Sequence, residues 1–296
     1  MPEGDTVLRT ARRLDAALAG RTLVRAELRW PTLGDVDLAG RTVSQVTAYG
    51  KQILTRFADD GRTSLTLRSH LRMEGQWSIV PAGPQHWPAA GGVRVRAVLA
   101  NLEWTAIGTW LGLLDLVPTD DESSLIGHLG PDIMVDAFPS SGRAEAVVRL
   151  LRRPDRTVGS ALLDQTNVAG IGTMYMAETL FLQGISPWTP VAEVDVPAAL
   201  DVARKLLLRG VTTAVPSTTG IPRAGQNTFV HGRSGKPCRR CGAIVRVAMV
   251  GDPTKERTAF YCPVCQPGPA PTDGGRARRP LGSNPSRPAT GYRRDR

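Results

Sequence analysis

The sequence predicts an α+β protein in which a strand-rich amino-terminal part precedes a helical part. Three observations predict this class. An amphipathic helical pattern opens the chain, short strand-like runs follow up to about residue 117, and helical periodicity takes over after Gly130-Pro131. At 296 residues the chain exceeds the usual size of one hydrophobic core. We therefore expect two or three packed units.

The first expected helix covers residues 5–20. Asp5 has a side chain suited to the N-cap position, and Gly20 is suited to ending the helix. The apolar residues between them recur at helical spacing: Val7, Ala11, Leu14 and Leu18. We expect this face of the helix to be buried.

The next hundred residues favour β-structure. Short runs of strand-forming residues alternate with Gly, Pro and Asp, and they cover residues 22–28, 52–57, 64–67 and 94–99. Such a pattern is typical of a β-rich domain built in two layers.

The second half of the chain favours helices and ends in a different composition. Helices are expected at residues 143–153, 158–164, 174–183 and 198–208. A small cysteine-bearing module occupies about residues 226–266. Beyond Gln266 the sequence consists mainly of Pro, Gly, Arg and Ser, with almost no large apolar residues. This last segment is therefore expected to be disordered.

The charge of the chain is compatible with a polyanionic partner but does not establish one. Lys and Arg number 37 against 27 acidic residues, which gives a net charge of +10. The segment 276–296 holds seven Arg and one acid, Asp295, so much of the excess lies in the expected tail. The alternative is a basic tail on a nearly neutral body.

Neither a membrane span nor a signal peptide is expected. No run approaches the roughly 18 apolar residues that a membrane helix needs. The opening Met1-Pro2-Glu3-Gly4-Asp5 has neither the basic flank nor the apolar stretch of a secretory signal. A cytoplasmic protein is the expectation.

The cysteines predict a metal site. The four of them form two CxxC pairs, Cys238 with Cys241 and Cys262 with Cys265, separated by twenty residues. This spacing is typical of two knuckles that offer four thiolates to one structural Zn²⁺. Two disulfides are the alternative, disfavoured in the cytosol. Unrelated buried thiols would not leave the rest of the chain without cysteine.

The amino terminus is a candidate nucleophile. Met1 before a small residue is normally removed, which would leave Pro2 with a free secondary amine. An α-amino group has a pKa near about 8, so a useful fraction is unprotonated at neutral pH and can attack an aldehyde-level carbon. Glu3 beside it could move protons. The plainer interpretation is that these residues are only a common opening.

Five segments together resemble the formamidopyrimidine-DNA glycosylase/endonuclease VIII family. They occur in the order of that family and span residues 1 to 266: residues 1–5 (MPEGD), 49–51 (YGK), 162–172 (LLDQTNVAGIG), 230–242 (VHGRSGKPCRRCG) and 257–266 (RTAFYCPVCQ). Within them, residues 163–166 with Ala169-Gly170 resemble the endonuclease VIII branch more closely.

The resemblance implies a fold and a domain organisation. It implies an amino-terminal β-sandwich with a leading helix, a helix–two-turn–helix domain and a carboxy-terminal zinc-ribbon finger. We place the catalytic domain at residues 1–125, the DNA-binding helical domain at 126–225, the zinc finger at 226–266 and a basic tail at 267–296. Damaged double-stranded DNA would bind in the cleft between the domains, to a monomer.

The resemblance also implies roles for four catalytic residues. Pro2 would attack C1′ of the damaged nucleotide, and Glu3 would handle protons at the sugar. Lys51 corresponds to a lysine that contacts phosphate and supports β-elimination. Arg257 corresponds to an arginine that grips the phosphates beside the lesion and supports δ-elimination. The plainer interpretation of Lys51 and Arg257 is two solvated surface charges.

Four further residues are implied as DNA contacts. Met73 aligns with the residue that fills the hole left by an extruded base, and Arg72 beside it would touch DNA. His128 lies where relatives often carry a basic contact, although a packing histidine is the alternative. Thr173 stands where relatives usually have the Asn that holds phosphates, so the grip at this position would be weaker or altered.

The sequence therefore predicts a bifunctional DNA glycosylase and abasic-site lyase of base excision repair. It would remove oxidised bases, in the first instance pyrimidines, through an imine at Pro2, and would then cut the strand by β,δ-elimination. One alternative is a formamidopyrimidine or 8-oxoguanine glycosylase. The other is a non-catalytic zinc-ribbon protein that binds DNA.

Overall fold

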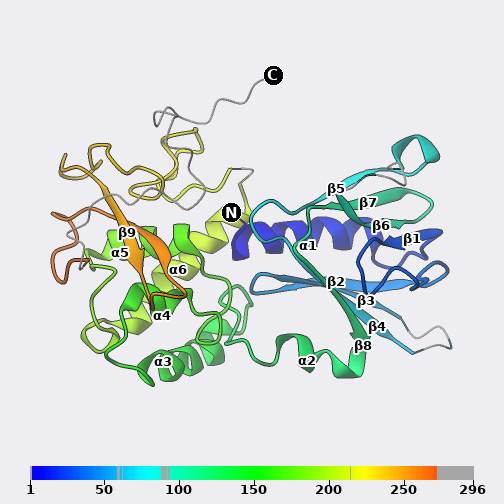
Figure 1. Cartoon of the computed structure of the whole chain (residues 1–296), viewed down its shortest axis with the longest axis horizontal. Coiled ribbons are helices and arrows are strands. Elements are labelled where there is room, and N and C mark those ends of the chain that lie inside the picture. Colours follow the sequence, from blue (N-terminus) through cyan, green and yellow to red (C-terminus); the bar gives the residue numbers. More distant parts are fainter. Residues whose placement is uncertain are drawn as a thin grey trace.

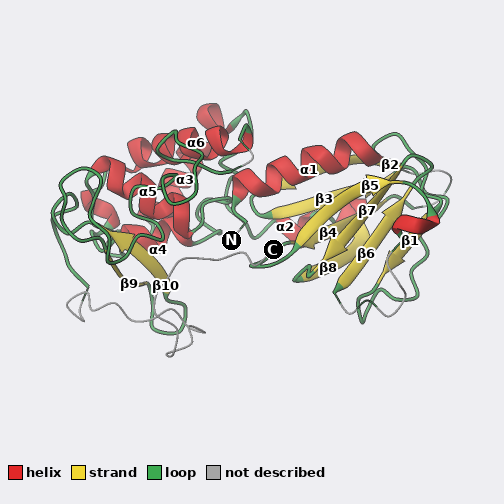
Figure 2. Ribbon diagram, turned by 90° about the horizontal axis from the view of Figure 1, so that it is seen from above, coloured by secondary structure: helices red, strands yellow, loops and turns green. Residues whose placement is uncertain are grey.

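The computed structural model describes residues 2–58, 61, 63–87, 92, 94–213 and 215–271. Within these residues the chain forms a strand-rich half with one long helix and a helical half that carries a β-hairpin (Figures 1 and 2). The expected α+β class is confirmed. The start of the first helix lies at the junction between the two halves (Figure 1).

Helix α1 (Gly4–Leu18) packs its apolar face into the strand-rich half. Val7 and Leu14 on this face are buried, as the spacing predicts. The helix begins one residue earlier than expected, and Asp5 is not its N-cap: Glu3 occupies that position. Asp5 is instead buried in the first turn, where its carboxylate accepts a hydrogen bond from the Tyr175 hydroxyl at 2.8 Å. Its side chain serves a tertiary contact and not the helix end.

The amino-terminal half is a sandwich of two antiparallel four-stranded sheets, with the strand orders β1-β6-β7-β5 and β2-β3-β4-β8. Buried side chains of α1 and of both sheets form one hydrophobic cluster. The strands are β1 (Arg25–Leu28), β2 (Val43–Tyr49), β3 (Gln52–Phe57), β4 (Leu65–His70), β5 (Gln76–Pro81), β6 (Val95–Ala100), β7 (Trp104–Thr109) and β8 (Leu113–Pro118). The expected two-layered β-domain is confirmed.

The helical half has its own core, built from apolar faces of α3 to α6. Its helix α6 extends beyond the expected range at both ends. Asp195 caps its start, accepting a hydrogen bond from the Ala198 N–H at 3.0 Å. The helices after α1 are α2 (Ser123–Ile126), α3 (Arg143–Leu151), α4 (Val158–Leu163), α5 (Thr173–Gln183) and α6 (Val196–Val211), and the short helical turns are η1 (Pro84–His86), η2 (Thr119–Asp121), η3 (Phe138–Gly142) and η4 (Val191–Glu193).

The carboxy-terminal hairpin of β9 (Arg246–Val250) and β10 (Arg257–Tyr261) packs on α5. A small separate cluster, including Phe181, Val230 and Cys262, joins it to that helix. Of the expected tail, residues 267–271 are described, and the Pro269 carbonyl accepts a hydrogen bond from the Ser186 hydroxyl at 2.7 Å. Residues 272–296 lie outside the described part.

None of the described helices combines the length and the apolar character that crossing a bilayer requires.

Candidate active site at the domain junction

The tip of the β2–β3 hairpin touches the helical half. Tyr49 pairs with Gln52, which leaves Gly50 and Lys51 as the turn. Gly50 has φ +56°, and a Cβ at this position would lie only 2.7 Å from the Cβ of Ala169. Only glycine suits both the backbone conformation and the close approach. The turn therefore places Lys51 against residues 169–172, between α4 and α5.

The start of α1 approaches the same segment. The Gly4 N–H donates to the Gly170 carbonyl at 3.0 Å. The carboxylate of Glu3, which is buried, accepts hydrogen bonds from the backbone N–H groups of Gly172 at 2.8 Å and Met174 at 2.8 Å. These N–H groups belong to the first turn of α5, where they have no partner inside the helix and the helix dipole favours an anion. Glu3 thus fixes the two halves together and directs its carboxyl to the junction.

The environment of Glu3 perturbs its protonation. Burial raises the pKa of Glu3 above its usual value, while the charge of Lys51 and the hydrogen bonds from the first turn of α5 oppose this rise. A carboxyl whose pKa is raised in this way is better able to carry a proton near neutral pH.

Lys51 is held at the same place. Its Nζ donates to the Ile171 carbonyl at 2.6 Å, and the Gln165 side-chain amide donates to the same oxygen at 3.0 Å. Burial lowers the pKa of Lys51, the negative charge of Glu3 raises it, and the positive charge of Arg257 lowers it. Lys51 therefore lies within electrostatic reach of both Glu3 and Arg257.

Arg257 and Pro2 complete this group. Arg257 is exposed at the start of β10, and its guanidinium donates to the Glu256 carbonyl at 3.1 Å. Its remaining N–H groups can therefore take an external anion. Pro2 is half-buried and directly precedes Glu3. The four residues predicted to be catalytic thus come from the two residues before α1, the β2–β3 turn and the β9–β10 hairpin, which the fold gathers at one junction.

The Arg72–Met73 loop lies beside this group. Met73 is 66% exposed, which is unusual for a side chain of this kind, and Arg72 has a positive φ of 49°. The Arg72 N–H donates to His70 Nδ1 at 2.8 Å, and His70 pairs across the sheet with Gln52, the residue after Lys51. Burial lowers the pKa of His70 to about 4, assisted by the charge of Lys51.

The other two predicted DNA contacts are placed differently. Thr173 is the first residue of α5 and is 7% exposed, so its side chain is largely covered by protein. His128 is exposed on the segment after α2, two residues before Gly130, whose carbonyl accepts from the Tyr49 hydroxyl at 3.1 Å.

The four cysteines come together in space. Their sulfur atoms lie within 4.8 Å of one another, with 3.5 Å between Cys241 and Cys262 and 3.9 Å between Cys238 and Cys265. Four thiolates about 2.3 Å from one tetrahedral Zn²⁺ would be separated by about 3.8 Å, so this donor set fits zinc. Backbone N–H groups of Arg240 and Cys265 point at cysteine sulfurs at 3.4 Å.

Two structurally important residues gave no signal of their own in the sequence. Glu178 looks like an ordinary residue of α5, yet it is fully buried and accepts backbone hydrogen bonds from Phe229, Val230 and His231 at 2.7–2.8 Å. Gly172 looks like part of a turn, but a Cβ there would lie 2.3 Å from the carboxyl carbon of Glu3. Both roles depend on residues distant in the sequence.

Comparisons with known proteins agree with this architecture. Residues 1–107 match the formamidopyrimidine-DNA glycosylase N-terminal domain, and residues 129–219 match the formamidopyrimidine-DNA glycosylase H2TH domain. The chain belongs to the formamidopyrimidine-DNA glycosylase/endonuclease VIII family. The resemblance expected from the five sequence segments is confirmed.

Relatives of this chain are named after either of the two branches of the family, endonuclease VIII or formamidopyrimidine-DNA glycosylase. The chain is 46% identical to "Probable endonuclease 8 2" of Streptomyces coelicolor, over 93% of this chain and 98% of the relative. It is 38% identical to "DNA-(apurinic or apyrimidinic site) lyase Nei2" of Mycolicibacterium smegmatis, over 90% of this chain and 99% of the relative. It is 33% identical to the formamidopyrimidine-DNA glycosylase of Paracoccus denitrificans, over 90% of this chain and 100% of the relative. The similarity to the endonuclease VIII branch is therefore the greater, as expected.

A solved family structure shares the fold. The Lactococcus lactis formamidopyrimidine-DNA glycosylase, bound non-covalently to DNA containing an abasic site, superposes with a TM-score of 0.73 at 23% identity. The match covers 90% of this chain and 100% of the other. The leading helix, sandwich, helical domain and four-cysteine hairpin are thus the fold of this family.

Proposed function

We propose that this protein is a bifunctional DNA glycosylase and abasic-site lyase that removes oxidised bases and then cuts the strand. The observation that carries the proposal is the arrangement of Glu3 and Lys51. A buried carboxyl directly follows Pro2 and lies within reach of a lysine whose pKa is lowered. A binding module has no use for such a pair.

The residues suggest the following chemistry. After removal of Met1, the Pro2 amine attacks C1′, and the bond between C1′ and the damaged base breaks. The base leaves with the electron pair of that bond and takes up the proton that the Pro2 nitrogen loses. Glu3 donates a proton to the sugar ring oxygen, so that the ring opens and a positively charged imine (an iminium) forms between Pro2 and C1′. Loss of a C2′ proton then expels the 3′ phosphate, and a second elimination expels the 5′ phosphate. Lys51 and Arg257 stabilise the negative charge of these phosphates.

Oxidised pyrimidines are the proposed substrates. The greater similarity to relatives named endonuclease 8 2 favours them over the 8-oxoguanine type of lesion. Met73 is proposed to fill the space left by the extruded nucleotide, because it is exposed beside the junction. Arg72, His128 and Thr173 are proposed as further DNA contacts, the last chiefly through its position at the start of α5.

The four-cysteine cluster is proposed to hold one structural Zn²⁺. The ion would fix the β9–β10 hairpin, and thereby Arg257, relative to α5. All four ligands come from the protein, so the ion has no open position for substrate.

Covalent trapping tests the proposed function. Borohydride should link the protein to duplex DNA containing an abasic site, and peptide mapping should locate the adduct at Pro2. A variant that retains extra residues before Pro2 should not be trapped, because an amide nitrogen is not nucleophilic. An adduct at Lys51, or none with wild type, would overturn the assigned nucleophile. A panel of duplexes with one defined lesion each, scored for strand cleavage, then separates pyrimidine from 8-oxoguanine preference.

A further inference from the structure

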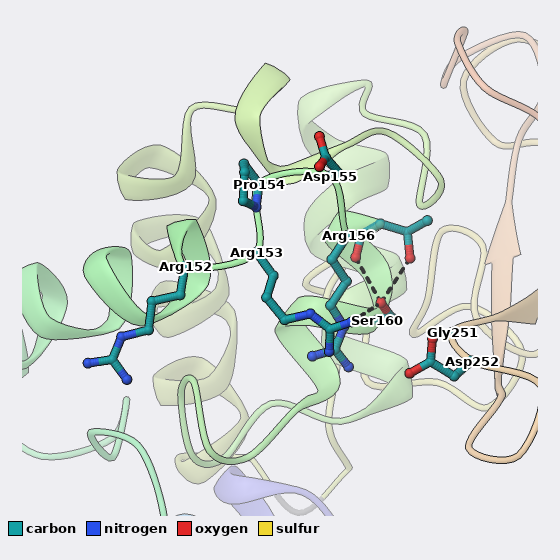
Figure 3. A pocket seen from close by; sticks show the side chains of 9 residues that line it. Arg152, Arg153, Pro154, Asp155, Arg156, Ser160, Gly251 and Asp252 are labelled. Carbon is teal, nitrogen blue, oxygen red and sulfur yellow. Dashed lines mark hydrogen bonds between the residues drawn. The ribbon is translucent and has the colours of Figure 1, made fainter.

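A polar cavity lies outside the group around Glu3. It has a volume of about 520 Å³ and separates the segment after α3 from the turn of the β9–β10 hairpin. Arg152, Arg153 and Arg156 line one side, and Gly251 with Asp252 lines the other (Figure 3). This volume is within the usual range of ligand sites, far above the roughly 30 Å³ of one water molecule.

The arginines of this cavity differ in what they bind. Arg156 is held in place, since its Nη1 donates to Asp164 at 2.7 Å and its Nε donates to the Ser160 hydroxyl at 3.0 Å. Arg152 and Arg153 are exposed, and neither takes part in an ion pair within the described part of the chain. The cavity thus has a fixed wall and two cations available to an external anion.

The view of the cavity shows how these side chains are directed. Arg153 and Arg156 extend in the same direction, toward Ser160, whereas Asp155 points away from them (Figure 3). Arg152 extends to the opposite side, away from Ser160 (Figure 3). The hydroxyl groups of the wall are used within it: Thr157 donates to Ser160 Oγ at 2.9 Å, and Ser160 donates to the Thr157 carbonyl at 3.0 Å. The guanidinium groups are therefore the donors that this cavity offers, and clustered guanidinium groups are typical of a phosphate site.

The cavity continues toward the proposed active site. A second hollow of about 220 Å³ shares Arg156, Ser160 and Gly251 with the first and is lined by Arg257 and Gln165 at its other end. Gln165 hydrogen-bonds the Ile171 carbonyl that also accepts from Lys51. We call the two hollows together the α3–α4 trough. It connects Arg257, which lines the second hollow, with Arg152, which lines the first.

We propose that the α3–α4 trough binds backbone phosphates of one DNA strand, beyond those held at Arg257. The inference rests on the proposed function, which places DNA at Arg257. The strand would leave the junction past Arg257, pass Arg156 and reach Arg153 and Arg152. Its contacts are to phosphate, so they add affinity without selecting the lesion. The duplex must therefore extend on one side of the lesion to be bound at full strength.

The test compares two doubly substituted proteins. Arg152→Ala with Arg153→Ala removes the free cations of the trough. The control, Arg12→Ala with Arg13→Ala, removes the same charge from exposed positions of α1 in the strand-rich half. Affinity for an abasic-site duplex is measured across a salt series, with long flanks on both sides and with either flank shortened to the lesion. Single-turnover cleavage at saturating DNA is measured in parallel.

The trough variant should bind the long duplex about tenfold more weakly at low salt. Its log–log salt slope should be reduced by roughly one for each phosphate that the substituted arginines no longer neutralise. Shortening the duplex on the side of the lesion that faces the trough should abolish the difference in affinity between the trough variant and wild type. Shortening it on the other side should leave that difference unchanged. Cleavage at saturation should be unchanged. Equal affinities and slopes for wild type and variant would overturn the inference, as would the same weakening in the α1 control.

Two further readouts separate other outcomes. If inorganic phosphate binds wild type and not the trough variant, while duplex affinity is the same in both, the cavity serves a free phosphate and the inference is wrong. If wild-type protein is not trapped on abasic DNA, the proposed function fails, yet the affinity series still reports on the trough. The two failures are therefore distinguishable.

Discussion

Glu3 and Gly172 fit against each other with no space for an added atom. The Gly172 N–H donates to the Glu3 carboxylate at 2.8 Å, and a Cβ on residue 172 would lie 2.3 Å from the carboxyl carbon. The backbone of Gly172 has φ −122°, which any residue can adopt. Glycine is therefore required here by contact with Glu3 and not by backbone conformation.

Gly172→Ala should displace the carboxyl of Glu3 from the first turn of α5. We expect trapping on abasic DNA to slow by at least about tenfold, since a misplacement of roughly 1 Å can cost more than that. Single-turnover trapping rates measure the effect. Gly34→Ala is the control, because its Cβ would meet nothing closer than 3.8 Å. Wild-type rates for Gly172→Ala would contradict the role given to Glu3.

Glu178→Gln should loosen the segment that leads into the cysteine hairpin. One of the two carboxylate oxygens becomes an amide NH₂ that faces backbone N–H donors of residues 229–231. Leaving such buried donors unpaired costs about 1–3 kcal/mol each. Thermal unfolding should show a clearly lowered midpoint. Glu193→Gln, at a position on the surface turn η4, should leave the midpoint unchanged. Equal midpoints in both variants would refute the anchoring role of Glu178.

Loss of zinc should disrupt the β9–β10 hairpin while the sandwich remains folded. The cluster that joins the hairpin to α5 is small and includes Cys238 and Cys262, whereas the sandwich has a separate core. Cys262→Ser should therefore release the metal and weaken DNA binding while the sandwich still unfolds cooperatively. Metal content, DNA affinity and thermal unfolding measure these effects. Full DNA affinity in metal-free protein would contradict a structural zinc.

Stability should fall in acid partly because of His70. Its pKa is lowered to about 4 in the folded protein, first by burial and then by Lys51, Arg72 and Arg68. In the unfolded chain the pKa is about 6.5. Between these values the unfolded chain binds a proton that the folded protein does not. The contribution of neutral His70 to the free energy of unfolding is therefore fully present above about pH 6.5 and declines toward pH 4.

His70→Asn isolates this contribution. The difference in unfolding free energy between wild type and variant should shrink as the pH falls from 7 to 4.5, by at most about 1.4 kcal/mol per pH unit. The partial exposure of His70 makes the observed change smaller. Denaturant unfolding at several pH values measures it. A constant difference across this range would show that His70 does not titrate as described.

Local pattern was sufficient for much of the fold. The spacing of Val7 and Leu14 predicts the buried face of α1, and the run at residues 52–57 coincides with β3. Both depend on neighbours in the sequence, whose periodicity reflects one buried face. The position of Asp5 was predicted incorrectly, because its partner, Tyr175, is 170 residues away.

The sequence by itself determined the kinds of chemistry present: an opening Pro2-Glu3, a glycine-lysine turn and two CxxC pairs. Only the tertiary structure decided that Glu3 caps α5, that Lys51 shares the Ile171 carbonyl with Gln165, and that Arg152 and Arg156 border one cavity with the hairpin turn. Residue types and spacings are local properties of the chain. Burial, shared acceptors and the electrostatic effect of one charge on another exist only after distant segments pack, since each depends on distances that folding alone sets.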